Sequence, residues 1–298
     1  MKVGVILPVG VVGTAGAVLS YAEIRALALA AEERGLDSIW IYDHLLFQFK
    51  DRPRENVWEG WTVLSGLAEA TRRVELGTMV LCTAFRNPAV LAKMAVTLDA
   101  MSGQRLILGL GAGWHEPEFT MFGLPFDHLA ARFEEAVRII APLVREGKVD
   151  FHGQYSSAIE CEMLPAPTRH IPVLIGANKP RMLRLTAQYA DSWNTGGGGQ
   201  AENLLPKRAA LEAAVAEVGR ESASLEITAS VNVAFPDLGV VPADADDPAK
   251  YLGGSVEAIA AGLRGFDEAG VGHVMGWLYP LTAESLARFA AAAALARG

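Results

Sequence analysis

The sequence predicts an α/β protein, a single (β/α)8 TIM barrel over residues 1–298 with insertions in the loops at its C-terminal face. Two observations lead to this prediction. Short, apolar, β-branched runs alternate with helical segments eight times along the chain, which is the pattern of buried parallel strands covered by helices. The chain has 298 residues, of which 51% are hydrophobic, and one closed barrel takes about 250 residues. Because no repeat, low-complexity tract or linker divides it, we expect one domain.

The elements follow in order. The expected strands are 3–8, 38–44, 74–83, 105–113, 171–177, a very short one within 191–199, 225–235 and 273–280. The expected helices lie near 20–35, 60–72, 88–101, 130–146, 180–189, 201–218 and 255–269, with a last one from Thr282. Ser20 and Glu23 have the spacing of a capping box at the start of the first helix. A hairpin insertion is expected around 151–155, a flexible loop at 196–199 and a mobile loop at 236–250.

The charge and the cysteine content exclude several classes of function. The net charge of −8 argues against binding to nucleic acid or to an anionic membrane, which both require a basic surface. Cys82 and Cys161 are too few for a disulfide framework and have no metal-ligand spacing. The first 22 residues allow either a secretory signal or a buried strand, and Pro8 and Gly10 favour the strand. We therefore expect a cytoplasmic protein with no metal.

The stretch RLILGLGAGWHEPEF (105–119) resembles the start of a nucleotide-phosphate loop but does not fit one. Its glycines, Gly109, Gly111 and Gly113, alternate, and Trp114 stands where the dinucleotide fingerprint needs its third glycine. The residues that follow are expected to form a loop, with no helix N-terminus for a pyrophosphate. Glycines in a strand indicate close approach by another group or the narrow inside of a barrel. Here we expect them to let a flat ring lie close at the C-terminal mouth.

Several segments together resemble the bacterial luciferase-like monooxygenase superfamily, particularly the branch that uses the deazaflavin F420. They are VGVILP, SIWIYDHLL, residues 74–123, IPVLIGANKPRMLRLTAQYADSWN and GVGHVMGWLYP, in that order over nearly the whole chain. The block 74–123 is the most specific. The resemblance implies a barrel that binds F420, or alternatively FMN, with the ring across the C-terminal mouth.

The resemblance also implies where the site lies. His44 matches the base of F420-dependent alcohol oxidations, and Asp43 is expected to orient it, to contact the ring or to cap the next segment. A non-prolyl cis peptide at Met79–Val80 is implied beneath the ring, with Thr83 near a pyrimidine-like edge and Gly113 beside it. The cofactor phosphate is expected at a helix N-terminus, held by Gly176, Ala177, Asn178, Lys179 and Arg181.

Aromatic and acidic side chains are expected to line the substrate pocket. They are Trp58, Trp114, His115, Glu116 and Trp193. Sugar-phosphate dehydrogenases of the family have a glutamate where this chain has Trp114, which argues against the same chemistry here.

The function that follows from the resemblance is F420-dependent hydride transfer to or from a small organic substrate. An FMN-dependent monooxygenase that works with a flavin reductase is the alternative, and a non-catalytic flavin-binding barrel is a second one. A sugar-phosphate barrel enzyme without flavin also stays open. A homodimer is expected from the family alone.

Overall fold

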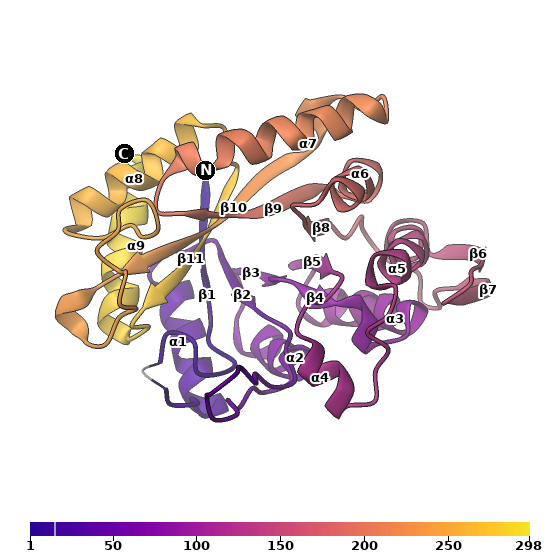
Figure 1. Ribbon diagram of the computed structural model, residues 1–298, viewed down its shortest axis with the longest axis horizontal. Coiled ribbons are helices and arrows are strands. Elements are labelled where there is room, and N and C mark those ends of the chain that lie inside the picture. Colours follow the sequence, from indigo (N-terminus) through magenta and orange to yellow (C-terminus); the bar gives the residue numbers. More distant parts are fainter. Residues whose placement is uncertain (15) are drawn as a thin grey trace.

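The computed structural model describes residues 1–14 and 16–298 as a barrel of parallel strands surrounded by helices (Figure 1). The barrel strands are β1 (Lys2–Ile6), β2 (Ser38–Ile41), β3 (Glu75–Thr78), β4 (Leu81–Cys82), β5 (Leu106–Gly111), β8 (Val173–Gly176), β9 (Ser192–Gly198), β10 (Glu226–Ala234) and β11 (His273–Tyr279). Their order in the sheet is β3-β2-β1-β11-β10-β9-β8-β5-β4, and β3 also pairs with β5. This last pairing closes the ring, so the predicted (β/α)8 barrel is confirmed.

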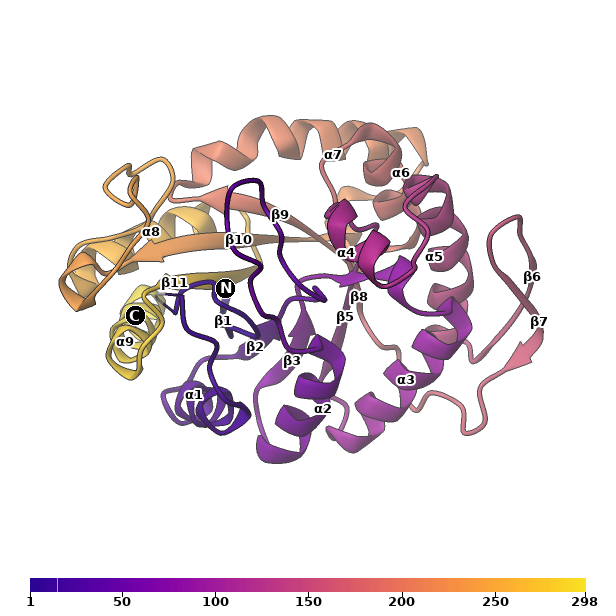
Figure 2. The ribbon, with the colours of Figure 1, turned by 60° about the horizontal axis from the view of Figure 1, so that its bottom comes forward.

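The helices lie outside the strands, and Figure 2 turns the mouth of the barrel forward, with α4 and the loop after β2 in front. They are α1 (Tyr21–Glu33), α2 (Gly60–Ala70), α3 (Pro88–Met101), α4 (Glu116–Met121), α5 (Leu129–Arg145), α6 (Pro180–Tyr189), α7 (Leu205–Glu217), α8 (Val256–Glu268) and α9 (Ala283–Arg297). The capping box of Ser20 and Glu23 forms at α1. The predicted insertion is the antiparallel hairpin of β6 (Lys148–His152) and β7 (Ser157–Glu162).

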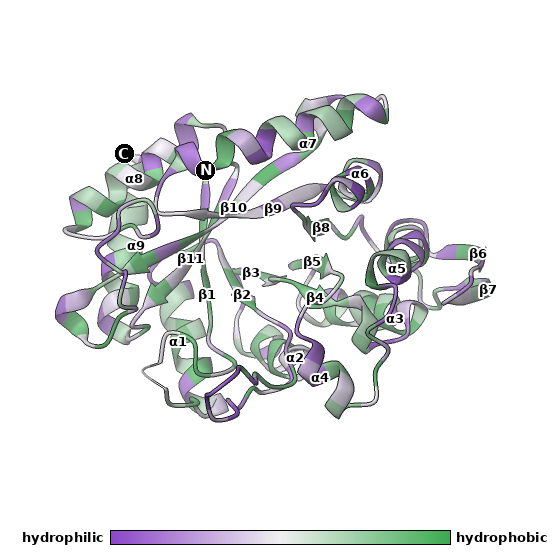
Figure 3. Cartoon of the chain, viewed as in Figure 1, coloured by the Kyte–Doolittle hydropathy of each residue, from purple (hydrophilic) through white to green (hydrophobic). Residues whose placement is uncertain are grey.

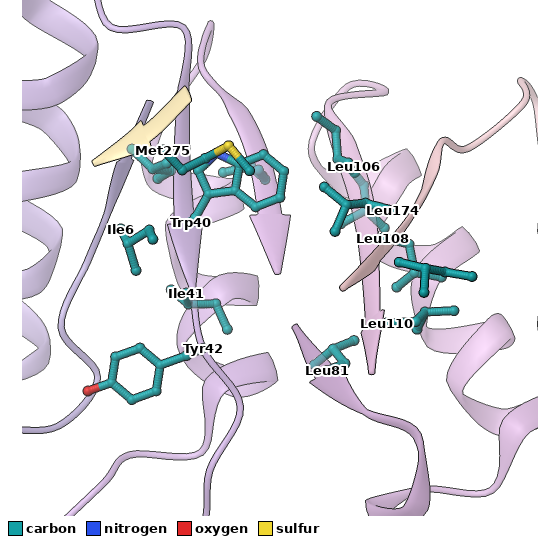
Figure 4. Close-up of a cluster of buried hydrophobic side chains, with 14 of the residues drawn as sticks. Ile6, Trp40, Ile41, Tyr42, Leu81, Leu106, Leu108, Leu110, Leu174 and Met275 are labelled. Atoms are coloured by element: carbon teal, nitrogen blue, oxygen red, sulfur yellow. The ribbon is translucent and has the colours of Figure 1, made fainter. Parts of the chain in front are cut away.

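Buried hydrophobic side chains from the strands and the helices form one core, and hydrophobic residues dominate the strands in Figure 3. Ile6, Trp40, Leu108, Leu174 and Met275 are buried members of this core, drawn in Figure 4. The first strand, β1, pairs with β2 and with β11. This pairing supports the strand interpretation of the first residues.

Three local predictions were wrong. Residues 116–121 form the short helix α4 rather than a loop, because Pro117 fits the first turn and Phe119 is fully buried. Strand β9 extends to Gly198, so three of the four glycines at 196–199 belong to the sheet instead of a flexible loop. The expected strand 74–83 is divided into β3 and β4 at Met79 and Val80.

Candidate active site

A cavity of about 130 Å³ lies at the C-terminal ends of β2, β4 and β5. It is lined by Tyr42, Asp43, His44, Met79, Val80, Leu81, Cys82, Gly111, Gly113, Trp114 and Glu118. This is the face on which barrel enzymes build their active sites. The structure therefore brings together His44, Met79, Val80, Gly113 and Trp114, all of which the sequence predicted for the site.

One wall of the cavity is the interruption between β3 and β4. The peptide bond Met79–Val80 is cis, as the resemblance implied. The hydroxyl of Thr78 donates to the carbonyl of Gly109 at 2.8 Å and accepts from its amide at 2.9 Å, which fixes the interruption against β5. Met79 and Val80 are half-buried and face the cavity.

The alternating glycines of β5 make room for this interruption. A Cβ on Gly109 would overlap the carbonyl oxygen of Thr78, and a Cβ on Gly111 would lie 2.5 Å from Cγ2 of Val80. Gly113 has φ +85°, and a Cβ there would lie 2.7 Å from the sulfur of Cys82. The expectation that these glycines serve chiefly to let a ring approach is thus corrected for Gly109 and Gly111. Their immediate reason is the neighbouring strand.

The imidazole of His44 is held by a buried carboxylate. Nδ1 of His44 lies 2.9 Å from Oε1 and 3.2 Å from Oε2 of Glu118, whose Oε2 also accepts from the amide of Leu45 at 2.8 Å. Glu118 is 1% exposed. Because an ionised carboxylate only accepts, Nδ1 carries the proton and Nε2 is left as a base. Nε2 makes no hydrogen bond to any residue in the described ranges.

Helix α4 brings Glu118 to this position. Phe119 anchors the helix, with ring centroids 5.2 Å from Phe85 and 5.0 Å from Phe126. At the start of α4, Nε2 of His115 accepts from the amide of Gln48 at 3.0 Å. Burial lowers the pKa of His115, which keeps the ring neutral and able to accept. His115 thus fixes α4 to the loop after β2 and does not line the cavity.

Asp43 has a different role from the one expected as an orienter of His44. Its carboxylate accepts from the amide of Cys82 at 2.9 Å and from both terminal nitrogens of Arg86, at 2.7 and 3.0 Å. Arg86 also pairs with Glu59, which caps α2 through the amides of Trp61 and Thr62. Burial raises the pKa of Asp43 and Arg86 opposes this rise, while Asp43 and Glu59 raise the pKa of Arg86. The network joins the segments after β2 and β4 to the start of α2, and Asp43 and Cys82 also line the cavity.

The thiol of Cys82 also lines the cavity, and burial raises its pKa to about 12. A thiol that stays protonated is a poor nucleophile. This supports its interpretation as a small buried hydrophobic residue.

The predicted phosphate loop lies beside the interrupted strand. A Cβ on Gly176 would lie 3.2 Å from Cγ1 of Val80, so the loop after β8 borders the same wall. Lys179 is exposed at the N-terminus of α6, where no side chain caps the helix. Asn178 accepts from Thr195 at 2.7 Å, and Arg181 pairs with Glu134 at 2.7 Å. Of the predicted cations, Lys179 is therefore the better placed for an anion.

Two backbone contacts alter the expected role of Ala177. Its amide donates to the carbonyl of Asn194 at 3.3 Å, and its carbonyl accepts from the indole of Trp193 at 2.8 Å. The amide of Ala177 is thus used within the barrel. Trp193 is fully buried and supports this loop from below, so its prediction as a pocket residue was wrong.

Three further predicted site residues lie outside the cavity. The hydroxyl of Thr83 donates to the carbonyl of Gly111 at 3.3 Å, and Thr83 faces the neighbouring pocket near Arg132. Trp58 donates to the carbonyl of Leu19 at 2.9 Å and lines an outer groove. Glu116 is exposed. The sequence placed Thr83 and Glu116 near strand ends and Trp58 before a helix, but gave no information on the direction of their side chains.

Sequence reasoning missed Glu118 and Arg86. Glu118 is the second glutamate of HEPEF, and a helical interpretation of that segment would have placed it on the buried side, next to Phe119. For Arg86, the sequence shows only an arginine shortly after a predicted strand end, and its contact with Asp43 is seen in the structure alone.

A histidine held by a buried carboxylate at the C-terminal mouth of a parallel barrel is typical of enzymes that move protons. The sequence profile described as luciferase-like monooxygenase matches residues 1–238, so the chain belongs to that family. An F420-dependent glucose-6-phosphate dehydrogenase of Kineococcus radiotolerans is 35% identical over 242 residues, 77% of this chain and 66% of that protein. The pyrimidine monooxygenase RutA of Allorhizobium ampelinum is 30% identical over 239 residues, 74% of this chain and 64% of that protein.

The matched segment thus spans slightly less than two thirds of these relatives. Among solved structures, an F420-dependent secondary alcohol dehydrogenase with an F420–acetone adduct superposes with a TM-score of 0.80 at 21% identity, covering 100% of this chain and 99% of that one. At this identity, the likeness supports the fold.

Two kinds of feature are absent from the described residues. No group of three or more His, Cys, Asp or Glu side chains among them is arranged to hold a metal ion. No helix in the described part of the chain has the length and apolar character needed to cross a membrane.

Proposed function

We propose that this protein is an oxidoreductase that binds F420 and transfers a hydride to or from a small organic substrate, with His44 as the proton acceptor. The observation that carries the proposal is the pair of His44 and Glu118 beside the interrupted strand at Met79 and Val80. The similarity to an F420-dependent dehydrogenase at 35% identity supports the choice of cofactor.

The residues present fit a flat deazaflavin ring with a phosphorylated side chain. Met79, Val80 and Gly111 form an apolar wall, and the faces of such a ring are apolar. Gly176 borders this wall, so the exposed N-terminus of α6 with Lys179 is within the same region of the mouth. Helix N-termini and lysines bind phosphate groups. When bound, the deazaflavin supplies a position that accepts or returns a hydrogen with both of its bonding electrons.

The side chain of His44 accepts and returns the proton of the reaction. When an alcohol carbon loses its hydride, the C–O bond becomes C=O and the hydroxyl proton passes to Nε2 of His44. Glu118 holds the ring through Nδ1 and stabilises the positive charge that this proton brings. In the reverse direction the same nitrogen returns the proton to the substrate oxygen.

The FMN-dependent monooxygenase is retained as the second candidate, because the likeness to a pyrimidine monooxygenase at 30% identity favours it. A flavin reductase partner belongs to this candidate alone. The homodimer and the cytoplasmic location stay predictions, and sedimentation of the purified protein tests the first of them.

The test is a titration of the purified protein with F420 and with FMN, followed by quenching of tryptophan fluorescence. We expect tight binding of F420, reduction of bound F420 by an alcohol, and loss of that reduction in His44→Gln with the F420 affinity retained. Tight binding of FMN alone, with oxygen consumption, would replace the proposal by the monooxygenase. Binding without turnover of any substrate would leave a carrier, and binding of neither would contradict both enzyme candidates.

A further inference from the structure

We infer that the substrate of this site is an uncharged alcohol or ketone whose reacting carbon bears a planar, apolar group, and that Trp114 and Phe49 bind this group. The inference rests on the proposed function, which it extends to a substrate class. Neither of these aromatic side chains takes part in the proton transfer at His44.

Trp114 combines two properties that are unusual for a core residue. Its ring lines the cavity, with its centroid 5.5 Å from that of His44 in an edge-to-face arrangement at 77°. At the same time Trp114 is 60% exposed. A large aromatic surface is therefore open to solvent directly beside the proposed base.

The exposed aromatic surface continues on the loop after β2. Phe49 is 38% exposed and lies nearly parallel to Trp114, with ring centroids 6.5 Å apart and planes at 26°. Phe49 in turn stacks on the buried Phe47 at 5.8 Å and 16°. His115 fixes α4 to this loop through the amide of Gln48. The rings of Trp114 and Phe49 are therefore held in a fixed position relative to each other.

The charges around the cavity disfavour an anionic substrate. None of the described residues that line the cavity is a lysine or an arginine. Two of them, Asp43 and Glu118, carry carboxylates. The nearby Arg86 is occupied by Asp43 and Glu59. The basic residues of the loop after β2, Lys50, Arg52 and Arg54, do not line the cavity. A phosphate group beside His44 would thus meet the carboxylate of Glu118 and no lysine or arginine among the described residues of the cavity lining.

Stacking explains how such a site can select its substrate. A planar apolar group on Trp114 buries aromatic surface, and aromatic pairs contribute beyond the area that they bury. The attached carbon and its hydroxyl are then presented to Nε2 of His44. During oxidation the C–H bond of that carbon breaks, its hydrogen leaves as hydride to the cofactor, and the hydroxyl proton goes to Nε2, which gives the ketone.

The experiment compares three probes with the cofactor-loaded protein: 1-phenylethanol, 2-butanol and glucose 6-phosphate. We expect kcat/KM for 1-phenylethanol to exceed that for 2-butanol by about 10-fold or more, with no turnover of glucose 6-phosphate. In Trp114→Ala this ratio should fall at least about fivefold. Phe122→Ala is the control, since Phe122 is also exposed on the α4 segment but lines no part of the cavity, and it should keep the wild-type ratio.

Calorimetric titration with acetophenone gives a reading that does not depend on turnover. Weaker binding of acetophenone in Trp114→Ala, with wild-type affinity in Phe122→Ala, supports the inference even where no alcohol is oxidised. Equal affinity in all three proteins overturns it. Turnover of 2-butanol or glucose 6-phosphate at least as efficient as that of 1-phenylethanol also overturns it and leaves the proposed function intact. Absence of cofactor binding instead contradicts the proposed function.

Discussion

Nδ1 of His44 and the carboxylate of Glu118 lie 2.9 Å apart, although 74 residues separate them in the chain. His44 follows β2, whereas Glu118 comes from α4, a helix of six residues that sits over the mouth of the barrel. The carboxylate has three hydrogen-bonding contacts, two to the imidazole and one to the amide of Leu45. The orientation and the tautomer of the proposed base are therefore set by a residue outside the strands.

Glu118→Gln should lower kcat of the cofactor-loaded enzyme by about 10- to 100-fold, a part of the 10²–10⁴-fold that a general base contributes. The amide can still contact Nδ1, but it does not stabilise the imidazolium. Steady-state kinetics with the best alcohol, together with the pH profile of kcat/KM, measure this effect.

Glu116→Gln is the matched control for Glu118→Gln, because Glu116 lies two residues earlier on the same helix and is exposed. It should keep wild-type kinetics. If both variants have the same kcat and the same pH profile, Glu118 has no role in positioning His44.

Lys179→Met should weaken binding of the phosphorylated cofactor by about 10- to 150-fold, since a charge-assisted contact of this kind contributes ~1.5–3 kcal/mol when formed. Arg181→Met should change the affinity less, because Arg181 is paired with Glu134 at 2.7 Å. Fluorescence titration with F420 measures both. Equal losses in the two variants would show that the pair with Glu134 opens when the cofactor binds.

Arg86→Met should destabilise the protein by about 3–5 kcal/mol, because it leaves the buried carboxylate of Asp43 without its partner. Arg86→Lys should recover only a part of this loss, since an ammonium group does not reproduce the two-pronged contact. Arg184→Met, which removes an exposed pair with Glu217, is the control and should cost at most about 1 kcal/mol. Urea unfolding followed by circular dichroism provides the comparison, and a loss in Arg86→Met no larger than in the control would contradict the prediction.

The fold was largely predictable from the sequence because its signals are local. Apolar runs, the capping box of Ser20 and Glu23, and Pro88 and Pro180 at helix starts mark elements without reference to the rest of the chain. Errors occurred where a distant contact decides the structure. Helix α4 forms on six residues because Phe119 is buried between Phe85 and Phe126, and such packing leaves no periodic pattern in so short a segment.

The site was predicted in part for the same reason. His44, Met79 and Val80 follow strand ends, and strand ends of a barrel meet at one face. The direction of a side chain, however, depends on its partners, which the sequence does not show. For this reason Thr83 and Trp193 were predicted for the site although they lie outside the cavity. Orientation of His44, one of the roles expected of Asp43, belongs to Glu118, since the carboxylate of Asp43 is already used by Arg86 and Cys82.

Gly109→Ala should destabilise the protein by at least ~2 kcal/mol, because the new Cβ would overlap the backbone carbonyl of Thr78, which a rotamer change cannot relieve. Gly196→Ala in β9 is the control: no atom lies within 4 Å of a Cβ built there, and its φ is not positive. It should change the unfolding free energy by less than about 0.5 kcal/mol. Similar urea midpoints for the two variants would refute the explanation of the glycine pattern.

His273 lies at the end of the barrel opposite the site, and it makes the free energy of unfolding depend on pH. The ring is buried, and Nε2 lies 2.7 Å from the hydroxyl of Ser38, which also accepts from the indole of Trp40 at 2.7 Å. The bond joins the imidazole to Ser38, and its direction depends on which ring nitrogen of His273 carries the proton. Burial lowers its pKa from 6.5 to about 3, and the positive charges of Lys2 and Arg297 add to this.

The unfolded chain binds a proton at this histidine below about pH 6.5, whereas the folded chain does so only near pH 3. The contribution of neutral His273 to the free energy of unfolding is thus complete above pH 6.5 and is lost as the pH falls toward 3. The total loss is up to ~5 kcal/mol, of which ~3 kcal/mol falls between pH 7 and 4.5. His273→Gln keeps a hydrogen-bonding partner for Ser38 but cannot titrate, so its unfolding free energy should fall less over this interval. Urea unfolding of both proteins at pH 7 and at pH 4.5 measures the difference. If wild type and variant lose the same free energy, another group is responsible for the acid sensitivity of the fold.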